Sequence, residues 1–464
     1  MTRATPGSRE GRLALLALAA LLLAYTPDMG RGFIKDDFAW IAGSRVDSAA
    51  DLLGLFGRHN GFYRPLVAAS FAADARLFGL RPFGYAATNL LLVLASAAAL
   101  ACLARALGLG PPGALLAAGL WALSPHGICW GVMWISGRTS LLLTLCALLA
   151  ALWLARGRPV GAAVCAFLAL LAKEEAVLLP AVLAGGVALG LLPAPPARAA
   201  SSGRARAALR TALLFAPGLG AYLLLRARTG AYWPSTAPPF YRPTLDPAAL
   251  LRNAAEYADR ALTFPLAALL VAALVARAWP RPDVERRRAA FFGLLWLAGG
   301  YGLTLFLPVR SSLYACFPAA GSALAAAALL EGLPCSAASR PAVRLRFLAA
   351  LALVALVPLL HSRNLRLRRT AELSAHALAA TSEAAPLLAS GATLVLHDAD
   401  TRVNLRAAFG TLADTALRLH LGLGAVRVVI EPPLPGGSAT GAPAAGQHRT
   451  VEYALISGRL VPLP

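Results

Sequence analysis

The stretch LALLALAALLLAYTPDMGRGFIKDDF (residues 13–38) joins an unbroken apolar run to an adjacent pair of carboxylates. The apolar part ends near Tyr25 and is typical of a helix that enters a lipid bilayer. Asp36 and Asp37 follow just outside this segment, where burying a carboxylate is costly and usually marks a functional site. The alternative interpretation is a helix start, because Asp favours the N-cap and residues 38–42 can form a helix.

The rest of the chain repeats this apolar pattern. It has 464 residues, of which 58% are hydrophobic, whereas a soluble domain has about 45–50% apolar residues. Most of the excess is Leu and Ala in blocks of roughly 15–25 residues, the length that crosses about 30 Å of hydrocarbon as a helix. The composition therefore predicts an all-α polytopic membrane protein.

We predict about eleven transmembrane helices from these blocks. They cover residues 13–25, 84–104, 112–125, 139–155, 159–172, 176–193, 208–225, 261–277, 289–308, 313–331 and 346–361. The segment 66–80 is amphipathic and is predicted to lie along the membrane interface. The membrane domain is thus expected to occupy residues 1–361, with a first outer loop at 26–83.

The charge pattern orients the predicted helices. The chain carries 43 Lys and Arg against 22 Asp and Glu, a net charge of +21. The arginines cluster in every second connection, where they set topology and meet anionic lipid head groups. This distribution predicts a cytoplasmic N-terminus. It also predicts that the basic residues meet the lipid bilayer and that the protein binds no nucleic acid. The Ala- and Arg-rich composition favours a bacterial inner membrane.

The last part of the chain, residues 362–464, changes character. Strands are predicted at 392–397, 426–430 and 451–456, a helix at 408–421 and a loop at 431–446. We expect a small α/β module on the periplasmic side. The arginines at 363, 366, 368 and 369 favour the cytoplasmic side instead, but long segments can cross a membrane despite their charge.

This topology gathers the unusual polar side chains at the outer ends of the predicted helices. They are Asp36, Asp37, Arg64, His126, Arg138, Lys173, Glu174, Glu175 and Arg310, with Tyr314 close to the last. A pore would spread such groups through the depth of the bundle. Acids and bases at one face suit a reaction on a lipid whose phosphate lies there. A carboxylate can take a proton from an acceptor hydroxyl, and Arg and Lys can neutralise a leaving phosphate.

Each of these residues also has a purely structural interpretation. His126 follows Pro125 and can end a helix, and Arg138 can extend to head groups. Lys173 can pair with its acidic neighbours, and Arg310 can anchor the interface with an aromatic side chain. The spacing of His, Cys and acidic residues predicts no metal or other cofactor, although two outer carboxylates can hold a divalent ion weakly.

Several short motifs occur in a characteristic order over roughly residues 12–335. They are GFIKDDF (32–38), YRPL (63–66), LFGLRPFGY (77–85), TNLL (88–91), WISGR (134–138), AKE (172–174) and PVRSSLY (308–314). This order resembles the membrane portion of the GT-C glycosyltransferases that use polyprenyl-phosphate sugars. The resemblance is to the transmembrane, TPR-repeat O-mannosyltransferase-like group and its bacterial relatives, and it extends into the tail at 403–406 and 416–419.

The resemblance implies an inverting hexosyltransferase. A sugar such as mannose would move from a polyprenyl-phosphate donor to a hydroxyl on a glycan, lipid or protein at the outer face of the inner membrane. It implies that Asp36 or Asp37 is the catalytic base. It assigns Lys173, Glu174 and Arg310 to the lipid-phosphate or structural side of the site. We expect Arg138, Lys173 and Arg310 to stabilise the departing lipid phosphate. The other residues expected to bind substrate are Arg64, His126 and Tyr314.

The chain departs from the pattern of these relatives at two places. They often have a His-x-Glu before the WISGR block, whereas this chain has His126 without the Glu, and Ser140 stands where an acid often follows the Arg. Either the acceptor differs from the usual one or the site is weakened. Two rival hypotheses stand beside the glycosyltransferase. One is a transporter or flippase for a lipid-linked glycan, and the other is a non-catalytic membrane scaffold.

Overall fold

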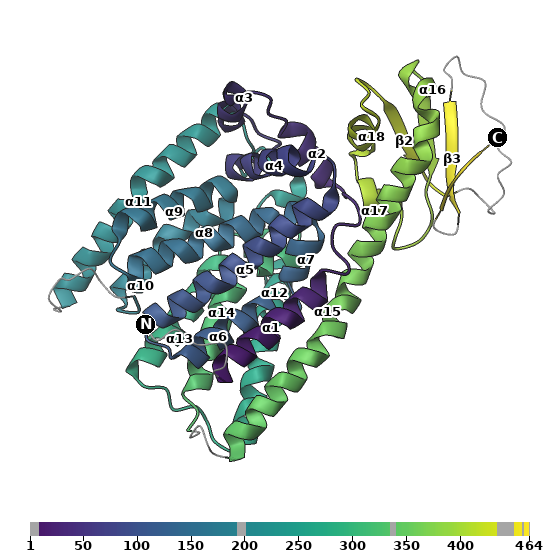
Figure 1. Cartoon of the computed structure of the whole chain (residues 1–464). Helices are drawn as coiled ribbons and strands as arrows, with labels where there is room; N and C mark the ends of the chain where they lie inside the picture. Colours follow the sequence, from purple (N-terminus) through teal and green to yellow (C-terminus); the bar gives the residue numbers. More distant parts are fainter. Residues whose placement is uncertain (1–8, 193–200, 335–339, 434–449, 457–458, 464) are drawn as a thin grey trace.

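The protein is a bundle of long helices with a small sheet at one end (Figure 1). The computed structural model describes residues 9–192, 201–334, 340–433, 450–456 and 459–463. In those ranges, every predicted apolar block contains a helix. The helices are α1 (Arg9–Tyr25), α5 (Pro82–Ala106), α6 (Pro111–Ala122), α8 (Arg138–Ala155), α9 (Pro159–Ala172), α10 (Leu179–Ala188), α11 (Ser201–Thr229), α12 (Pro247–Ala276), α13 (Val284–Tyr301), α14 (Ala319–Glu331) and α15 (Arg340–Ala380).

The long helices have the length and composition of membrane spans. Among the described residues, five segments are long and apolar enough to cross a bilayer, and three shorter helices are apolar as well. The five are Pro82–Ala106, Ile135–Ala155, Gly203–Thr229, Pro247–Ala276 and Val343–Ala389. The predicted class, an all-α polytopic membrane protein with a small α/β tail, is confirmed. The number of about eleven spans stays a prediction.

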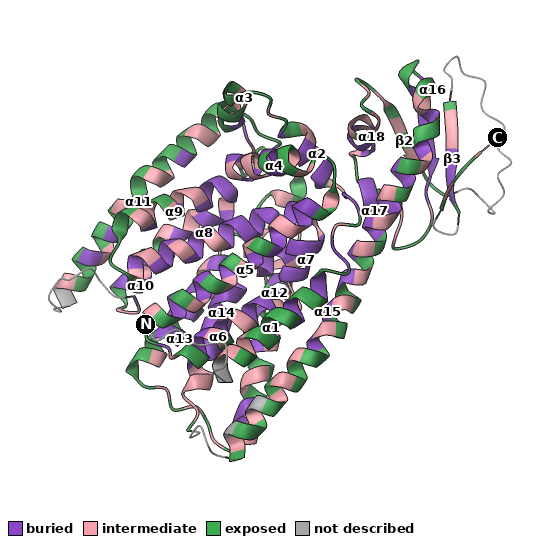
Figure 2. Ribbon diagram, in the orientation of Figure 1, coloured by how far each residue is buried: buried purple, intermediate pink, exposed green. Residues whose placement is uncertain are grey.

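Small residues allow α13 and α14 to cross at close range. A Cβ placed on Gly293 would lie 2.4 Å from the carbonyl oxygen of Gly321, and one placed on Gly321 would lie 2.2 Å from the carbonyl oxygen of Gly293. Such contacts replace the hydrophobic effect as the source of helix association in lipid. Figure 2 shows that the buried residues concentrate in this central part of the bundle.

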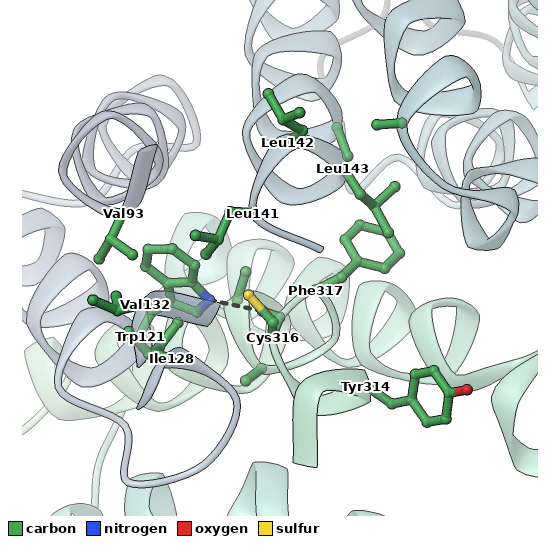
Figure 3. Packing of buried hydrophobic residues seen from close by; sticks show 14 of the residues in the cluster. Val93, Trp121, Ile128, Val132, Leu141, Leu142, Leu143, Tyr314, Cys316 and Phe317 are labelled. Atoms are coloured by element: carbon green, nitrogen blue, oxygen red, sulfur yellow. Dashed lines mark hydrogen bonds between the residues drawn. The ribbon is translucent and has the colours of Figure 1, made fainter. Parts of the chain in front are cut away.

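Two buried tryptophans fix the turn that precedes α14. The indole of Trp121 donates a 2.8 Å hydrogen bond to the carbonyl of Cys316, and that of Trp296 donates to the carbonyl of Phe317 at 3.0 Å. Figure 3 shows Trp121 packed among aliphatic side chains, with Tyr314 on the far side of the Cys316 turn. The tryptophans therefore position Tyr314 at the edge of the core.

The first outer loop contains short helices rather than irregular chain. They are α2 (Asp36–Gly43), α3 (Ala49–Gly54) and α4 (Pro65–Phe78), which lie together at one end of the bundle (Figure 1). The amphipathic segment predicted at 66–80 is α4. Further short elements carry the motifs between spans: α7 (Ile128–Met133) and the 3₁₀ turns Ile135–Gly137, Glu174–Leu178 and Ser312–Ala315.

The tail is joined to the bundle by α15, which packs along α1 and continues into the small domain (Figure 1). The boundary predicted between 361 and 362 lies inside this helix, and the division there stays a prediction. The four strands form one sheet in the order β2-β1-β3-β4. The tail elements are α16 (Ala385–Ala389), β1 (Thr393–His397), α17 (Leu405–Phe409), α18 (Ala413–Leu421), β2 (Arg427–Glu431), β3 (Thr450–Ile456) and β4 (Arg459–Pro462).

The three predicted strands are present, with β1 parallel to both β2 and β3. The single helix predicted at 408–421 is wrong, because Gly410 adopts a φ of 57° and ends α17 before α18 begins. The strand β4, antiparallel to β3, was not predicted. Residues 434–446 of the predicted loop lie outside the described residues.

Candidate functional site

Asp37 connects the GFIKDDF loop to the WISGR turn. Its carboxylate accepts hydrogen bonds from the backbone N–H of Ile34 at 2.9 Å and of Ser136 at 2.7 Å, and also from the Ser136 hydroxyl. The side chain is buried, and burial raises its pKa to about 7 against the lowering effect of these three donors. Both oxygens are occupied, so Asp37 is a connector of two motifs that are distant in sequence.

The raised pKa of Asp37 predicts a pH dependence of stability. Because the folded chain binds this proton more tightly than the unfolded chain does, stability should fall as the pH rises from about 4 towards 7. Asp37→Asn should flatten this slope. The check is the melting temperature of the purified protein in detergent at pH values between about 4.5 and 7. A slope that is the same in both proteins would contradict the assignment.

Asp36 is exposed, and its carboxylate accepts no hydrogen bond from any described residue. Surrounding protein still displaces enough water to raise its pKa, while Arg64 and Lys35 oppose the shift. A carboxylate with a raised pKa is a stronger base towards a hydroxyl group. Of the two acids, Asp36 is the one available to an incoming molecule.

Arg64 and Glu174 form a two-point ion pair next to Asp36. The Arg64 Nε donates to Glu174 Oε2 at 3.0 Å, and Nη2 donates to Oε1 at 2.5 Å. Burial opposes ionisation of Glu174, but Arg64 outweighs it and lowers the pKa of Glu174 to about 2. The pair joins the start of α4 to the turn after α9, a contact between residues far apart in sequence.

Lys173 lies behind this pair in a buried cluster. Its ammonium is 2.6 Å from Glu175 Oε1, donates to Ser140 Oγ at 2.8 Å and lies over the Tyr314 ring at 4.9 Å. Burial raises the pKa of Glu175 although Lys173 opposes it. The second oxygen, Glu175 Oε2, is buried and has no partner among the described residues. Lys173 is thus shared between the Glu175 carboxylate, the Ser140 hydroxyl and the Tyr314 ring.

A second group of charges lies on α12 and the chain before α14. Arg310 pairs with Glu256, which also accepts a 2.7 Å hydrogen bond from Arg260 Nη2. Arg260 Nη1 is buried and has no partner in the described part of the chain. Nearby, the rings of Tyr257 and Tyr301 stack with centroids 4.7 Å apart, and the Tyr301 hydroxyl is also unpaired among those residues.

His126 faces the same group of charges. Its Nδ1 is buried without a hydrogen-bond partner in the described ranges. Burial lowers the pKa of His126, the positive charges of Arg363 and Arg260 lower it further, and Asp259 opposes them. The imidazole is therefore held in its neutral form beside α12 and α15.

Arg138 lies inside the protein and not at the open edge. Its Nη2 is 2.5 Å from Asp74 Oδ2 and also donates to the Tyr85 carbonyl at 2.9 Å, while Nε donates to Asn89 Oδ1 at 2.7 Å. Nη1 donates to Ser70, and the guanidinium lies over the Phe71 ring at 4.7 Å. With every donor in use, Arg138 joins α4, α5 and α8 and has none left for a phosphate.

The structure thus brings the predicted residues into two neighbouring groups. Asp36, Arg64, Lys173, Glu174 and Tyr314 form the first, and His126 and Arg310 belong to the second. Sequence reasoning missed Glu256 and Arg260, because the apolar run was predicted to begin at 261 and the polar first half of α12 was treated as loop. Their spacing of four residues on one helix was the available signal. In the described residues, no group of three or more His, Cys, Asp and Glu side chains is placed to hold a metal ion.

Fold and site together define a multi-pass membrane protein with polar groups concentrated at one end of its helices. Comparison with solved structures aligns the chain with ArnT from Cupriavidus metallidurans in the apo state, at 14% identity over 90% of this chain and 85% of that one, with a TM-score of 0.48. The same protein bound to undecaprenyl phosphate aligns at 13% identity over 91% and 86%, with a TM-score of 0.44.

A second protein in this comparison is the archaeal oligosaccharyltransferase AglB from Archaeoglobus fulgidus, in complex with an inhibitory peptide and a dolichol-phosphate. It aligns at 12% identity over 89% of this chain and 63% of that one, with a TM-score of 0.47. No protein-family model matches the chain. A search of curated proteins gives no match either.

Proposed function

We propose that the protein is a membrane glycosyltransferase that moves a sugar, such as mannose, from a polyprenyl phosphate to an acceptor hydroxyl. The acceptor oxygen attacks the anomeric carbon of the sugar as the bond from that carbon to the phosphate oxygen breaks. The hydroxyl proton passes to Asp36, and the polyprenyl phosphate leaves with the bonding electrons. A single displacement of this kind inverts the configuration at the anomeric carbon.

The position of Asp36 is the observation that supports this proposal most strongly. It is the exposed member of the acidic pair, it has a raised pKa, and its partner Asp37 holds the loop in place. General base catalysis needs a carboxylate that is open to substrate and whose pKa lies closer to the working pH. Asp36 meets both conditions and Asp37 meets only the second.

The charges on α12 support a place for the leaving phosphate. Arg260 and Arg310 share the single carboxylate of Glu256, so neither arginine has a carboxylate of its own. The unpaired Nη1 of Arg260 can donate a hydrogen bond to a phosphate oxygen. Arginine pairs are suited to phosphate because their planar donors bind it at two points. In this account Lys173 positions Tyr314 and Ser140 and does not itself contact phosphate.

Transfer can be measured with membranes enriched in the protein and a polyprenyl phosphate that carries a radiolabelled sugar. We expect the label to leave the organic phase and appear on an acceptor at the outer face of the bilayer. Label that stays on the lipid in enriched and control membranes alike would contradict the proposed function.

Arg260→Gln should weaken use of the donor. Loss of one charge-assisted hydrogen bond to phosphate contributes about 1.5–3 kcal/mol, so the donor KM should rise roughly tenfold to a hundredfold. The matched control is Arg277→Gln, which removes an exposed arginine just past the opposite end of α12. A donor KM that is unchanged in Arg260→Gln, or equally raised in the control, would exclude Arg260 from the phosphate site.

A further inference from the structure

The tail contains a groove next to the GFIKDDF loop. It has a volume of about 670 Å³ and lies between the α17–α18 connection and the edge strand β2. This volume is within the range of about 300–1,000 Å³ that is usual for small-molecule sites. The lining combines two arginines and one acid with apolar side chains: Arg406, Arg427, Asp414, Thr411, Val428 and Ile430.

The groove has an excess of positive charge. The guanidinium of Arg427 makes no hydrogen bond or ion pair with any described residue. Arg406 contributes one long 3.3 Å hydrogen bond to the carbonyl of Ile430 and keeps further donors. Asp414 offsets only one of these two charges. Arginine forks recognise carboxylate and phosphate at two points, so the groove suits an anion.

The wall of the groove packs against the loop that carries the proposed base. A Cβ placed on Gly410, which lines the groove, would lie 4.0 Å from Lys35 Cγ. Lys35 precedes Asp36, and its backbone N–H donates a 2.8 Å hydrogen bond to the carbonyl of Ala408. The rings of Phe38 and Phe409 lie 5.9 Å apart and hold the same two segments together. The wall of the groove and the loop that carries Asp36 therefore form one packed unit.

We infer that this groove binds the acceptor, and that the acceptor is a sugar carrying a carboxylate or phosphate group. That this ligand is the acceptor rests on the proposed function, whereas the recognition of an anionic sugar rests on the groove itself. Arg427 and Arg406 take the anion, and the apolar side chains of Val428 and Ile430 contact the C–H face of the sugar ring. A hydroxyl of the same molecule then lies at the Asp36 end.

The test is equilibrium binding to the purified full-length protein in detergent, with glucuronic acid, glucose 6-phosphate and glucose as probes. We expect at least one of the two anions to bind roughly tenfold more tightly than glucose, because only an anion uses the arginine donors. The stronger of the two identifies the anion. Equal binding of all three probes would overturn the inference.

Variants separate the groove from general charge effects. Arg427→Gln should lose about tenfold in affinity for the anion, and Arg427→Lys, which keeps the charge, should lose less. The control Arg459→Gln removes an exposed arginine on β4, the opposite edge of the sheet, and should bind as the wild type does. Anion binding that persists in Arg427→Gln, or falls equally in Arg459→Gln, would contradict the assignment.

Binding is measured without transfer, so the two proposals fail separately. Asp36→Asn should reduce transfer by roughly 10²–10⁴-fold, whereas the groove is tested by the anion affinity of Arg427→Gln. Selective anion binding by a wild-type protein that transfers no sugar would refute the proposed function and still support the groove as a site for anionic sugars.

Discussion

Replacing Asp36 by Asn should reduce sugar transfer by roughly 10²–10⁴-fold, the range that general base catalysis contributes. Asn cannot accept the proton of the acceptor hydroxyl, but it has the same shape as Asp. The substitution breaks no side-chain hydrogen bond within the described residues. The melting temperature and membrane insertion should therefore remain those of the wild type. The measurement is the initial rate of label transfer at saturating donor, compared at equal amounts of folded protein.

The pH dependence of the wild-type rate gives an independent check on Asp36. The base must be deprotonated, so the rate should fall as the pH decreases through its pKa. Because the surrounding protein displaces water and raises that pKa, the fall should begin at a higher pH than for an ordinary aspartate, whose pKa is about 3.9. A rate that persists in Asp36→Asn, with the same pH profile, would transfer the role to another group.

Replacing Arg138 by Met should destabilise the protein by about 3–5 kcal/mol, the usual cost of leaving a buried partner charge alone. Asp74 would keep its carboxylate in the interior, and Asn89 would lose the 2.7 Å hydrogen bond from the guanidinium. Since Arg138 joins α4, α5 and α8, transfer should fall together with the folded population. Thermal or denaturant unfolding in detergent measures the effect.

A double-mutant cycle combines Arg138→Met with a second substitution, Asp74→Leu. Removing both charges should recover most of the stability lost in Arg138→Met, because a buried ion pair contributes little beyond what apolar packing provides. The control is Arg58→Met, whose ion pair with Asp51 is 4.0 Å long and exposed, and which should cost less than about 1 kcal/mol. Similar losses in Arg58→Met and Arg138→Met would contradict the buried role of Arg138.

The helices could be predicted because their cause is local. Apolar runs such as 84–104 and 139–155 exceed the length of any strand, and in lipid the backbone must satisfy its own hydrogen bonds. The strands β1, β2 and β3 were predicted from short apolar and β-branched runs bounded by turn residues. The break at Gly410 was missed, because the helical pattern of residues 408–421 continues on both sides of a glycine whose φ only the fold determines.

The roles of the acidic pair could not be predicted from the sequence. Both aspartates are adjacent, and what distinguishes them is the turn at Ser136, which lies 99 residues further along the chain and binds Asp37 alone. In the same way, the sequence indicated that Arg138 is an interfacial cation, whereas the structure shows it bound to Asp74 and Asn89. Residue type indicated which side chains matter, and long-range contacts determined how each is used.

Arg260 and Glu256 show a different limit. Their positions on α12 depend on where the helix begins, and the structure begins it at Pro247, well before the apolar run. The polar half of a helix that is apolar further on carries no membrane signal of its own. The tail groove depends on the same kind of information, since α17, α18 and β2 become neighbours only when the sheet forms.

The most direct test of the account uses wild-type protein reconstituted in vesicles with a polyprenyl phosphate that is labelled in both the sugar and the lipid phosphate. We expect the sugar label to move to an acceptor while free polyprenyl phosphate appears in equal amount, and both products should fall by roughly 10²–10⁴-fold in Asp36→Asn. Movement of the intact doubly labelled lipid across the bilayer, with no separation of the two labels, would contradict it and identify a transporter.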